Sequence, residues 1–195
     1  MAENRLKNNV KVVLIGGSSG SIDVLMHLLP ALQPPLSFAL LIVIHRRNTS
    51  DPTLANLFSL KTRVPVQEVE DKEDFLPGHL YLAPADYHVL FEPDGTLALD
   101  DSEKVHYSRP AIDVSFETAA DVFGPSVVGI LLSGASVDGT EGLRAIRNAG
   151  GTTIVQRPET AQSSFMPDHA LRSVPVDFVF DVPELVRYVQ SLHTD

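Results

Sequence analysis

The sequence contains no cysteine and no tryptophan among its 195 residues. Without cysteine the chain can form no disulfide, no thiolate metal site and no cysteine nucleophile, which favours a reducing compartment, so we expect a cytoplasmic protein. Long apolar runs are absent too. The longest run, residues 38–44, is too short to cross a bilayer, and residues 1–10 lack the apolar core of a secretory signal. We therefore expect no insertion into a membrane.

Positive charge is scarce. The chain contains 15 Lys and Arg residues and 25 Asp and Glu residues, which gives a formal net charge of −10 at pH 7. An acidic surface repels phosphate backbones, so we expect no nucleic-acid partner. Apolar residues make up 44% of the chain, enough for a substantial core, and the length fits one domain. We predict a single domain over residues 1–195, with its core at about 11–192.

Short apolar segments alternate with helical patterns along the chain. Runs without polar alternation predict strands covered on both faces, as in a parallel sheet, at residues 11–15, 38–44 and 126–132. Further strands are predicted at 64–69, 79–83, 152–156 and 176–180, and helices after residues 21, 50, 111, 139 and 181. Asp94-Gly95 indicates a hairpin, so the sheet is expected to be mixed. The fold class predicted is α/β: a three-layer α/β/α sandwich with a doubly wound, mostly parallel sheet and an antiparallel hairpin.

The first strand leads into a Gly/Ser turn. Gly16, Ser18 and Gly20 match the pattern G-x-S-x-G between a predicted strand and a predicted helix, the context of a nucleophilic serine. The N–H group of Ser19, at the start of that helix, can stabilise a developing oxyanion. Turns of this kind also bind phosphate or only reverse the chain, so the motif alone leaves three interpretations open.

His45 and Asp138 follow two other buried strands. In a doubly wound sheet the loops at the carboxyl ends of the strands share one edge, so both residues are expected near Ser18. An imidazole there can accept the serine proton, and a carboxylate can orient the imidazole. Asp138 fits equally well as the N-cap of the helix near Thr140, and Asp113 is a rival acid. The other six histidines are expected to be structural or on the surface.

Six features in a fixed order resemble the catalytic domain of the CheB-type chemotaxis protein-glutamate methylesterases. The resemblance covers residues 11–192, and the combination is specific where any one motif is not. The features are IGGSSGS at 15–21, the buried strand ending in His45, LPGHLYLAPADYH at 76–88, SRPAIDVSF at 108–116, SGASVDGTEG at 133–142 and FMPDHA at 165–170.

The resemblance implies an activity and a set of roles. Ser18 corresponds to the nucleophile, His45 to the general base and Asp138 to the acid that orients it. The implied reaction is hydrolysis of glutamyl methyl esters on methyl-accepting chemotaxis receptors, with deamidation of receptor glutamines as a second activity. No metal or organic cofactor is required. We expect a cytoplasmic monomer in signal transduction, whose partner is the cytoplasmic domain of such a receptor.

The sequence departs from the family pattern at three places. Ser19-Gly20-Ser21 stands where the family commonly has Thr-Gly-Gly, a mild change. Ala135 replaces the usual methionine near the expected oxyanion region, and because displacing one oxyanion donor costs about 2.7–4 kcal/mol, we expect weaker catalysis. Arg46 and Arg47 replace Met-Pro, and they either attract an acidic receptor segment or are solvated loop residues.

About ten residues precede the first strand, so we expect the phosphoacceptor domain that most family members carry to be absent from this chain. Two other functions stay open. One is a catalytically weak relative that only docks on a receptor. The other is a phosphate- or nucleotide-binding module built on residues 16–20, although the chain lacks G-x-G-x-x-G and has His45 where that module would place an acid.

Overall fold

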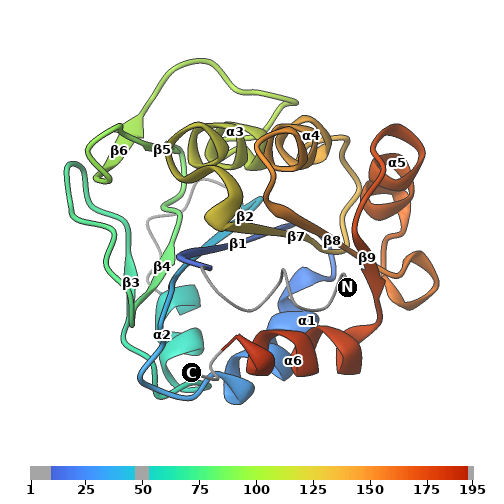
Figure 1. The fold of residues 1–195 in the computed structure, drawn as a ribbon, viewed down its shortest axis with the longest axis horizontal. Helices are drawn as coiled ribbons and strands as arrows, with labels where there is room; N and C mark the ends of the chain where they lie inside the picture. Colours follow the sequence, from blue (N-terminus) through green and yellow to red (C-terminus); the bar gives the residue numbers. More distant parts are fainter. Residues whose placement is uncertain (1–9, 47–52, 193–195) are drawn as a thin grey trace.

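The computed structural model describes residues 10–46 and 53–192, which build a seven-stranded sheet (Figure 1). The strand order is β3-β4-β2-β1-β7-β8-β9, and each of the six neighbouring pairs is parallel. The strands are β1 (Val12–Gly17), β2 (Ala39–Ile44), β3 (Val66–Glu68), β4 (Leu80–Leu82), β7 (Val127–Leu131), β8 (Thr152–Gln156) and β9 (Phe178–Phe180).

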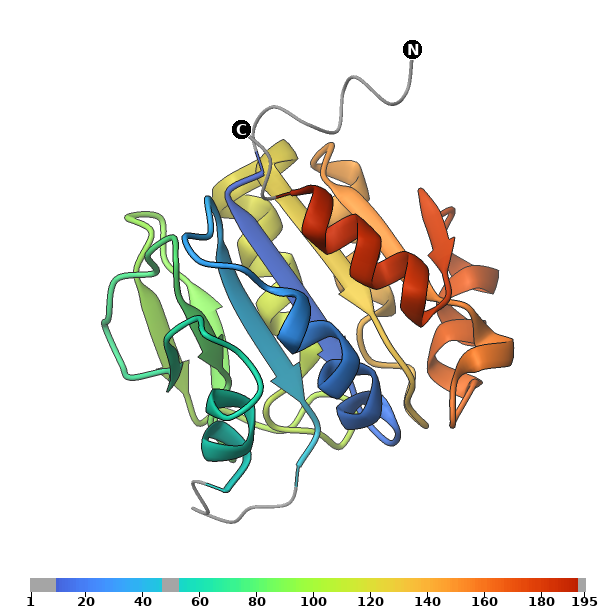
Figure 2. The same cartoon turned by 90° about the horizontal axis from the view of Figure 1, so that it is seen from below.

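Helices cover both faces of the sheet, so the predicted three-layer sandwich is confirmed (Figures 1 and 2). One face carries α1 (Ser21–Leu28), α2 (Thr53–Ser59) and α6 (Val182–Ser191). The other face carries α3 (Ile112–Phe123), α4 (Thr140–Asn148) and α5 (Phe165–Ser173). Single-turn 3₁₀ helices follow α1, α3 and β8: η2 (Leu29–Ala31), η3 (Gly124–Ser126) and η4 (Pro158–Thr160).

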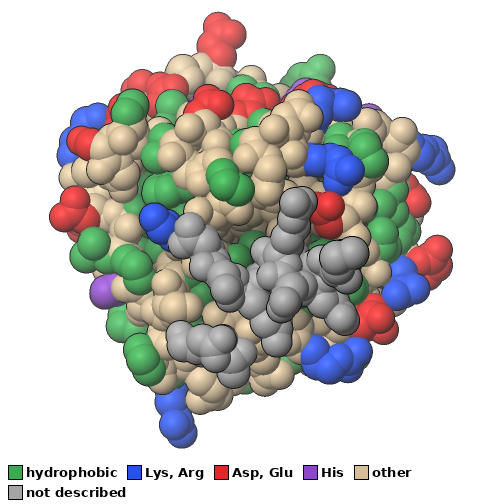
Figure 3. Space-filling view, viewed as in Figure 1, with side chains coloured by type: hydrophobic (Ala, Val, Ile, Leu, Met, Phe, Trp, Pro, Cys, Tyr) green, Lys and Arg blue, Asp and Glu red, His purple; other side chains and the backbone are tan. Residues whose placement is uncertain are grey.

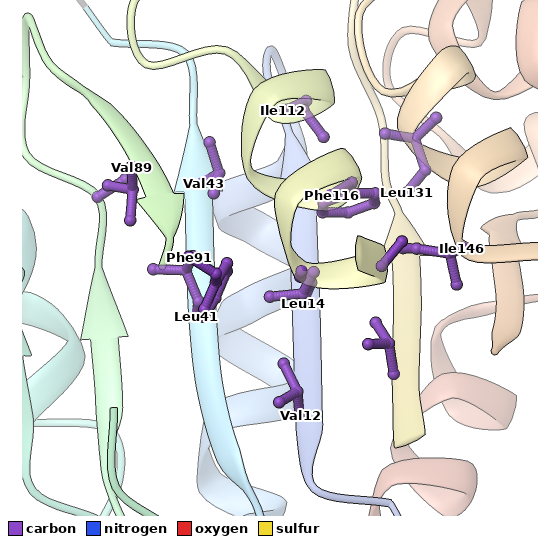
Figure 4. Packing of buried hydrophobic residues seen from close by; sticks show 14 of the residues in the cluster. Val12, Leu14, Leu41, Val43, Val89, Phe91, Ile112, Phe116, Leu131 and Ile146 are labelled. Atoms are coloured by element: carbon purple, nitrogen blue, oxygen red, sulfur yellow. The ribbon is translucent and has the colours of Figure 1, made fainter. Parts of the chain in front are cut away.

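The apolar runs of the central strands follow from burial on both faces. In β1, Val12 and Leu14 pack under α3 and α4, whereas Val13 and Ile15 belong to the cluster under α1 and α6. Successive side chains of a strand point to opposite faces, so both sets must be apolar. Figure 4 shows the first cluster, with α3 lying over the strands and its Phe116 among the buried side chains between helix and sheet.

The expectation of a mixed main sheet is wrong, because the hairpin forms a sheet of its own. Strands β5 (His88–Phe91) and β6 (Leu97–Asp100) pair only with each other, in antiparallel register. The hairpin packs against α3, where the Phe91 and Phe123 rings meet edge to face with centroids 5.5 Å apart. The contact with α3 buries the apolar side of the hairpin, although the hairpin does not pair with the parallel sheet.

The strand order reverses at β1, which places a topological switch point beside it. The chain leaves β1 through α1 to β2 on one side, and it enters β7 from α3 on the other side. Loops at the carboxyl ends of neighbouring strands diverge at such a point and leave room for a ligand. The loops after β1, β2 and β7 carry Ser18, His45 and Asp138 respectively.

The surface carries charged side chains of both signs. On the face that Figure 3 shows, acidic side chains gather along the upper edge, whereas acidic and basic side chains are interspersed at the sides. In residues 10–46 and 53–192, no helix combines the length and the apolar composition needed to cross a membrane.

Candidate active site

Ser18 lies at the first position after β1, held between two strand ends. Its N–H group donates to the carbonyl oxygen of Ser133 (2.9 Å), in the loop after β7. Gly16 is required just before it, because a Cβ there would lie 2.4 Å from Cγ2 of Ile112. Gly20 adopts φ +83°, a left-handed conformation that favours glycine and turns the chain into α1. The tight glycine turn thus places a half-buried serine at the switch point.

His45 is the neighbour of Ser18 across the β1–β2 pair. The parallel register ends with Gly17 opposite Ile44, and the His45 N–H donates to the Gly17 carbonyl (3.1 Å). The imidazole is 12% exposed, and its Nε2 lies 2.7 Å from Oδ2 of Asp138. An ionised carboxylate only accepts, so Nε2 carries a hydrogen. In the neutral ring, Nδ1 is then the nitrogen with a free lone pair.

Asp138 is a fully buried carboxylate that receives four hydrogen bonds. Oδ2 accepts from His45 Nε2 and from the Ile112 N–H (both 2.7 Å). Oδ1 accepts from the N–H groups of Asp113 (2.9 Å) and Gly139 (3.0 Å). Ile112 and Asp113 open helix α3, whose free N–H groups and dipole favour a negative charge. The carboxylate is therefore clamped by the start of α3.

These contacts keep Asp138 ionised. Burial alone would raise its pKa, but the hydrogen bond from His45 and those from the Asp113 and Ile112 N–H groups outweigh burial and hold the pKa of Asp138 below its usual value. A charged acceptor beside the ring fixes the imidazole tautomer, and it stabilises the imidazolium that forms when the ring accepts a proton.

The two alternatives for the acid are resolved by position. Asp138 does not cap α4, whose N-cap is Gly139 at φ +93° without a side-chain cap. Asp113 instead accepts from the Gly142 N–H through Oδ1 (2.7 Å), and its Oδ2 lies 3.2 Å from His106 Nε2. Burial and the neighbouring charge of Asp138 raise the pKa of Asp113 to about 7. It is Asp138 that contacts His45.

Two backbone amides beside Ser18 are available to an oxyanion. In the part of the chain that the structure describes, the N–H groups of Ser19 and Ala135 have no hydrogen-bond acceptor. Both residues are exposed, and they lie in the loops after β1 and β7. Gly134 N–H, by contrast, donates to the Ser163 carbonyl (3.1 Å) and is occupied.

A buried serine that sequence reasoning missed joins three loops behind the site. Ser133 Oγ donates to the Ser19 carbonyl (2.6 Å) and accepts from the Ser163 N–H (2.9 Å). Ser133 N–H donates to Oε1 of the buried Gln156 (2.8 Å), at the end of β8. The signal for this network in the sequence was Gln156, a polar residue at the end of the predicted strand 152–156. The network fixes the carbonyl of Ser19, the residue whose own N–H group has no acceptor among the described residues.

A cleft of about 380 Å³ opens beside His45. Its walls come from three segments, the residues after β2, the loop between β4 and β5, and the loop before α3: His45, Arg46, Asp86, Lys104, Tyr107, Ser108 and Arg109. Arg46 is only 14% exposed and forms an ion pair with Glu68, so its interpretation as a solvated loop residue is wrong. Because Glu68 neutralises it, Arg46 offers little free positive charge to a ligand. Arg47 lies outside the described residues.

The other described histidines have structural partners, as expected for that group. His27, His79 and His88 bond to backbone carbonyls, His106 pairs with Asp113, and His169 bonds to Thr140. His193 lies outside the described residues. Over residues 10–46 and 53–192, no group of three or more His, Asp or Glu side chains is arranged to hold a metal ion.

Comparison with known proteins identifies relatives of this fold and site. The family described as CheB methylesterase matches residues 13–189. A Leptospira interrogans protein, provisionally named protein-glutamate methylesterase/protein-glutamine glutaminase, is 36% identical over 177 residues, which cover 91% of this chain and 92% of the relative. A Chromohalobacter salexigens protein with the same activities in its name is 36% identical over 85% of this chain, and the match spans 48% of that longer relative.

Structure comparison gives the same relationship. The crystal structure of the Thermotoga maritima CheB methylesterase catalytic domain superposes with a TM-score of 0.89 at 28% sequence identity. The match covers 95% of this chain and all of that domain. The similarity extends over both helical layers, since it includes nearly every described residue.

Proposed function

Because the chain belongs to the CheB methylesterase family, we propose that it is a serine hydrolase that removes methyl esters from glutamyl side chains of chemotaxis receptors. The observation that carries the proposal is the hydrogen bond between His45 Nε2 and Asp138 Oδ2, formed beside the strand end that bears Ser18. The names of the relatives support the same reaction and add glutamine deamidation. We assign the protein to the cytoplasm as a monomeric single domain.

In the first half of the reaction, Ser18 Oγ attacks the ester carbonyl carbon. His45 accepts the Ser18 proton at Nδ1, the ring nitrogen not bonded to Asp138. The carbonyl oxygen becomes negative, and the N–H groups of Ser19 and Ala135 stabilise it. The bond to the methoxy oxygen then breaks, the imidazolium returns its proton to that oxygen, and methanol leaves.

In the second half, water hydrolyses the glutamyl ester of Ser18. His45 takes a proton from the water as the oxygen attacks the same carbonyl carbon, and it passes that proton to Ser18 Oγ as the ester bond breaks. The product is a free glutamate side chain. Deamidation follows the same path, except that the amide nitrogen takes the proton from the His45 imidazolium and leaves as ammonia.

The phosphate-binding alternative is disfavoured by the charges around the Gly/Ser turn. The buried carboxylate of Asp138, which its hydrogen bonds keep ionised, stands at the same sheet edge and would repel a phosphate group. The N–H groups of Ile112 and Asp113, which could bind an anion, are already taken by Asp138. A phosphate at residues 16–20 would therefore meet the negative charge of Asp138, and at the turn itself the Ser18 N–H is already taken by the Ser133 carbonyl oxygen.

The test is release of labelled methanol from methylated receptor membranes by the purified chain. We expect release by the wild type and its collapse in Ser18→Ala and His45→Ala, with Asp23→Asn, an exposed carboxylate on α1, as the neutral control. Circular dichroism would verify that each variant folds. Receptor binding without release by the wild type would reject the esterase and favour the docking-only relative.

A further inference from the structure

His88 is a buried histidine that the reaction described above does not use. It opens strand β5, and its relative exposure is 1%. Both ring nitrogens have partners: Nδ1 lies 3.1 Å from the Ala111 backbone nitrogen, and Nε2 lies 3.0 Å from the Glu103 carbonyl oxygen. A buried imidazole with two well-placed partners is a fixed bridge between two segments.

The partners determine the protonation of the ring. A backbone N–H can only donate, so Nδ1 must accept from Ala111 and carries no hydrogen. A carbonyl oxygen can only accept, so Nε2 must carry the hydrogen and donate it to Glu103. His88 is therefore held as the neutral Nε2–H tautomer. A second proton would break the hydrogen bond from Ala111, and the opposite tautomer would break both hydrogen bonds.

One end of the bridge supports the clamp on Asp138. Ala111 is the N-cap of α3, and no side chain of its own caps that helix. The next two residues, Ile112 and Asp113, are the ones whose N–H groups hold Asp138. His88 fixes the peptide directly before these donors, so it sets where the helix start meets the carboxylate.

The other end supports a wall of the cleft. Glu103 precedes Lys104, which lines the cleft beside His45. Arg109 holds the same loop independently, through hydrogen bonds to the carbonyls of Asp101 and Ser102. The loop therefore keeps an anchor when the bond from His88 to Glu103 is lost. Among the described residues, the Ala111 N–H has no acceptor besides His88.

We propose that His88 is a positioning residue for ester hydrolysis, acting through the N-terminus of α3 on Asp138 and thus on His45. This inference rests on the proposed function, because its effect on rate is defined only for an active hydrolase. Its structural part, the hold of His88 on Ala111, is independent of turnover. The bridge makes the triad's geometry depend on one tautomer of a residue outside it.

Two amide substitutions separate the ends of the bridge. In His88→Asn the side-chain oxygen occupies the place of Nδ1, so it can accept from Ala111 while the bond to Glu103 is lost. In His88→Gln the terminal amide reaches the place of Nε2, so it can donate to Glu103 while the acceptor for Ala111 is lost. His27→Gln, at an exposed position on α1, is the matched control.

The experiment measures kcat and KM for methanol release from a soluble glutamyl methyl ester peptide. We expect His88→Gln to lower kcat by up to about 10²-fold, the effect of displacing a catalytic group by about 1 Å, with little change in KM. His88→Asn should retain most of kcat and rescue the loss. In an Asp138→Ala background, His88→Gln should cost nothing further, because the residue through which it acts is gone.

Nuclear magnetic resonance supplies a readout that needs no turnover. Nitrogen shifts of the wild-type ring should show an unprotonated Nδ1 and a protonated Nε2. The Ile112 and Asp113 amide signals should move in His88→Gln and stay in His88→Asn. Equal loss of kcat in both variants, an undiminished loss in the Asp138→Ala background, or the opposite tautomer would overturn the proposal. Absence of release by a wild type with these signals would reject the esterase alone.

Discussion

At the scale of single residues, Asp138 satisfies four donors with two oxygens, and each donor comes from a different residue. A neutral amide of the same shape cannot do this, because one oxygen becomes an NH₂ group that confronts a donor. The position thus requires charge as well as shape. Asp138→Asn separates the two requirements without changing the size of the side chain.

We expect Asp138→Asn to lower kcat by about 10⁴-fold, since a wrongly held imidazole tautomer cannot accept the serine proton. The free energy of unfolding should fall by about 1–3 kcal/mol, the cost of leaving a buried donor unpaired. Methanol release and urea denaturation measure the two effects. An Asn variant with the turnover of the wild type would show that Asp138 is not the orienting acid.

Asp113 gives a prediction for pH. Its pKa in the folded protein, about 7, exceeds the ordinary value of 3.8, because of burial and the charge of Asp138. Between these values the folded state binds more protons than the unfolded state, so this carboxyl makes the free energy of unfolding fall as pH rises from about 4 to 7. Relative to Asp113→Asn, the wild type should therefore lose stability across that range.

Urea denaturation of both proteins at pH 4.5, 6 and 7.5 measures the difference. Carboxyl groups elsewhere titrate in both proteins and cancel, so the difference reports Asp113 and its coupling to Asp138. A stability difference that stays constant over this pH range would show that Asp113 titrates like a solvated carboxyl.

At the scale of elements, the close approach of β1 and α3 couples the nucleophile loop to the clamp on Asp138. A Cβ at Gly16 would overlap Cγ2 of Ile112, and the N–H of Ile112 binds Asp138. Ile112 is fully buried, so α3 cannot yield without losing packing. The two elements must therefore be complementary at this one contact.

Gly16→Ala should lower both stability and kcat, with an overpacking cost of about 1–3 kcal/mol in the free energy of unfolding. Ile112→Ala removes the opposing atoms, so we expect the double variant Gly16→Ala/Ile112→Ala to recover kcat relative to Gly16→Ala alone. A double-mutant cycle on thermal unfolding and methanol release measures the coupling. Additive effects would indicate that the methyl group added at position 16 is accommodated elsewhere.

Some elements could be predicted from the sequence and others could not. The predicted strand at 126–132 coincides with β7 within one residue at each end, because burial on both faces leaves a continuous apolar run. Helix α5 had no such pattern: only Met166, Pro167 and Ala170 are buried, and the proline stands in its first turn. Packing against α4 and β8 determines that helix, and packing is not visible in local periodicity.

The same distinction applies to the site. Strand ends predicted that His45 and Asp138 meet near Ser18, because parallel strands deliver their loops to one edge. The position after a strand end favoured Asp138 over Asp113, but the contacts that keep Asp113 away from His45 depend on the register of α3 against the loop after β7, which local patterns do not show. Ser133 and Gln156 were missed because their partners are distant in sequence.

At the scale of the whole molecule, the separate hairpin shows what local signals leave out. Asp94-Gly95 predicted the turn between β5 and β6. Whether either strand also pairs with the main sheet depends on how the layers assemble, and local sequence does not show it. The hairpin lies on α3, and the segment after it carries the cleft wall into the helix start that holds Asp138. An element outside the main sheet thus contributes to the site.

Net charge acts over the whole molecule as well. The formal charge of −10 should oppose the approach of an acidic substrate, and Arg46 does little to offset it because Glu68 neutralises this arginine. Repulsion between exposed charges is screened by salt, with a Debye length of about 10 Å at 0.1 M. The sign of the salt dependence therefore separates overall repulsion from local attraction.

For a helical peptide with one glutamyl methyl ester among glutamates, we expect kcat/KM to rise as sodium chloride increases from 50 to 300 mM, values that bracket the screening range of about 0.1 M. A peptide with glutamines in place of those glutamates is the control, and its kcat/KM should stay constant. The value of kcat should change in neither case, because screening acts on encounter and not on the bound state. A fall in kcat/KM for the acidic peptide would mean that basic groups at the cleft outweigh the net charge.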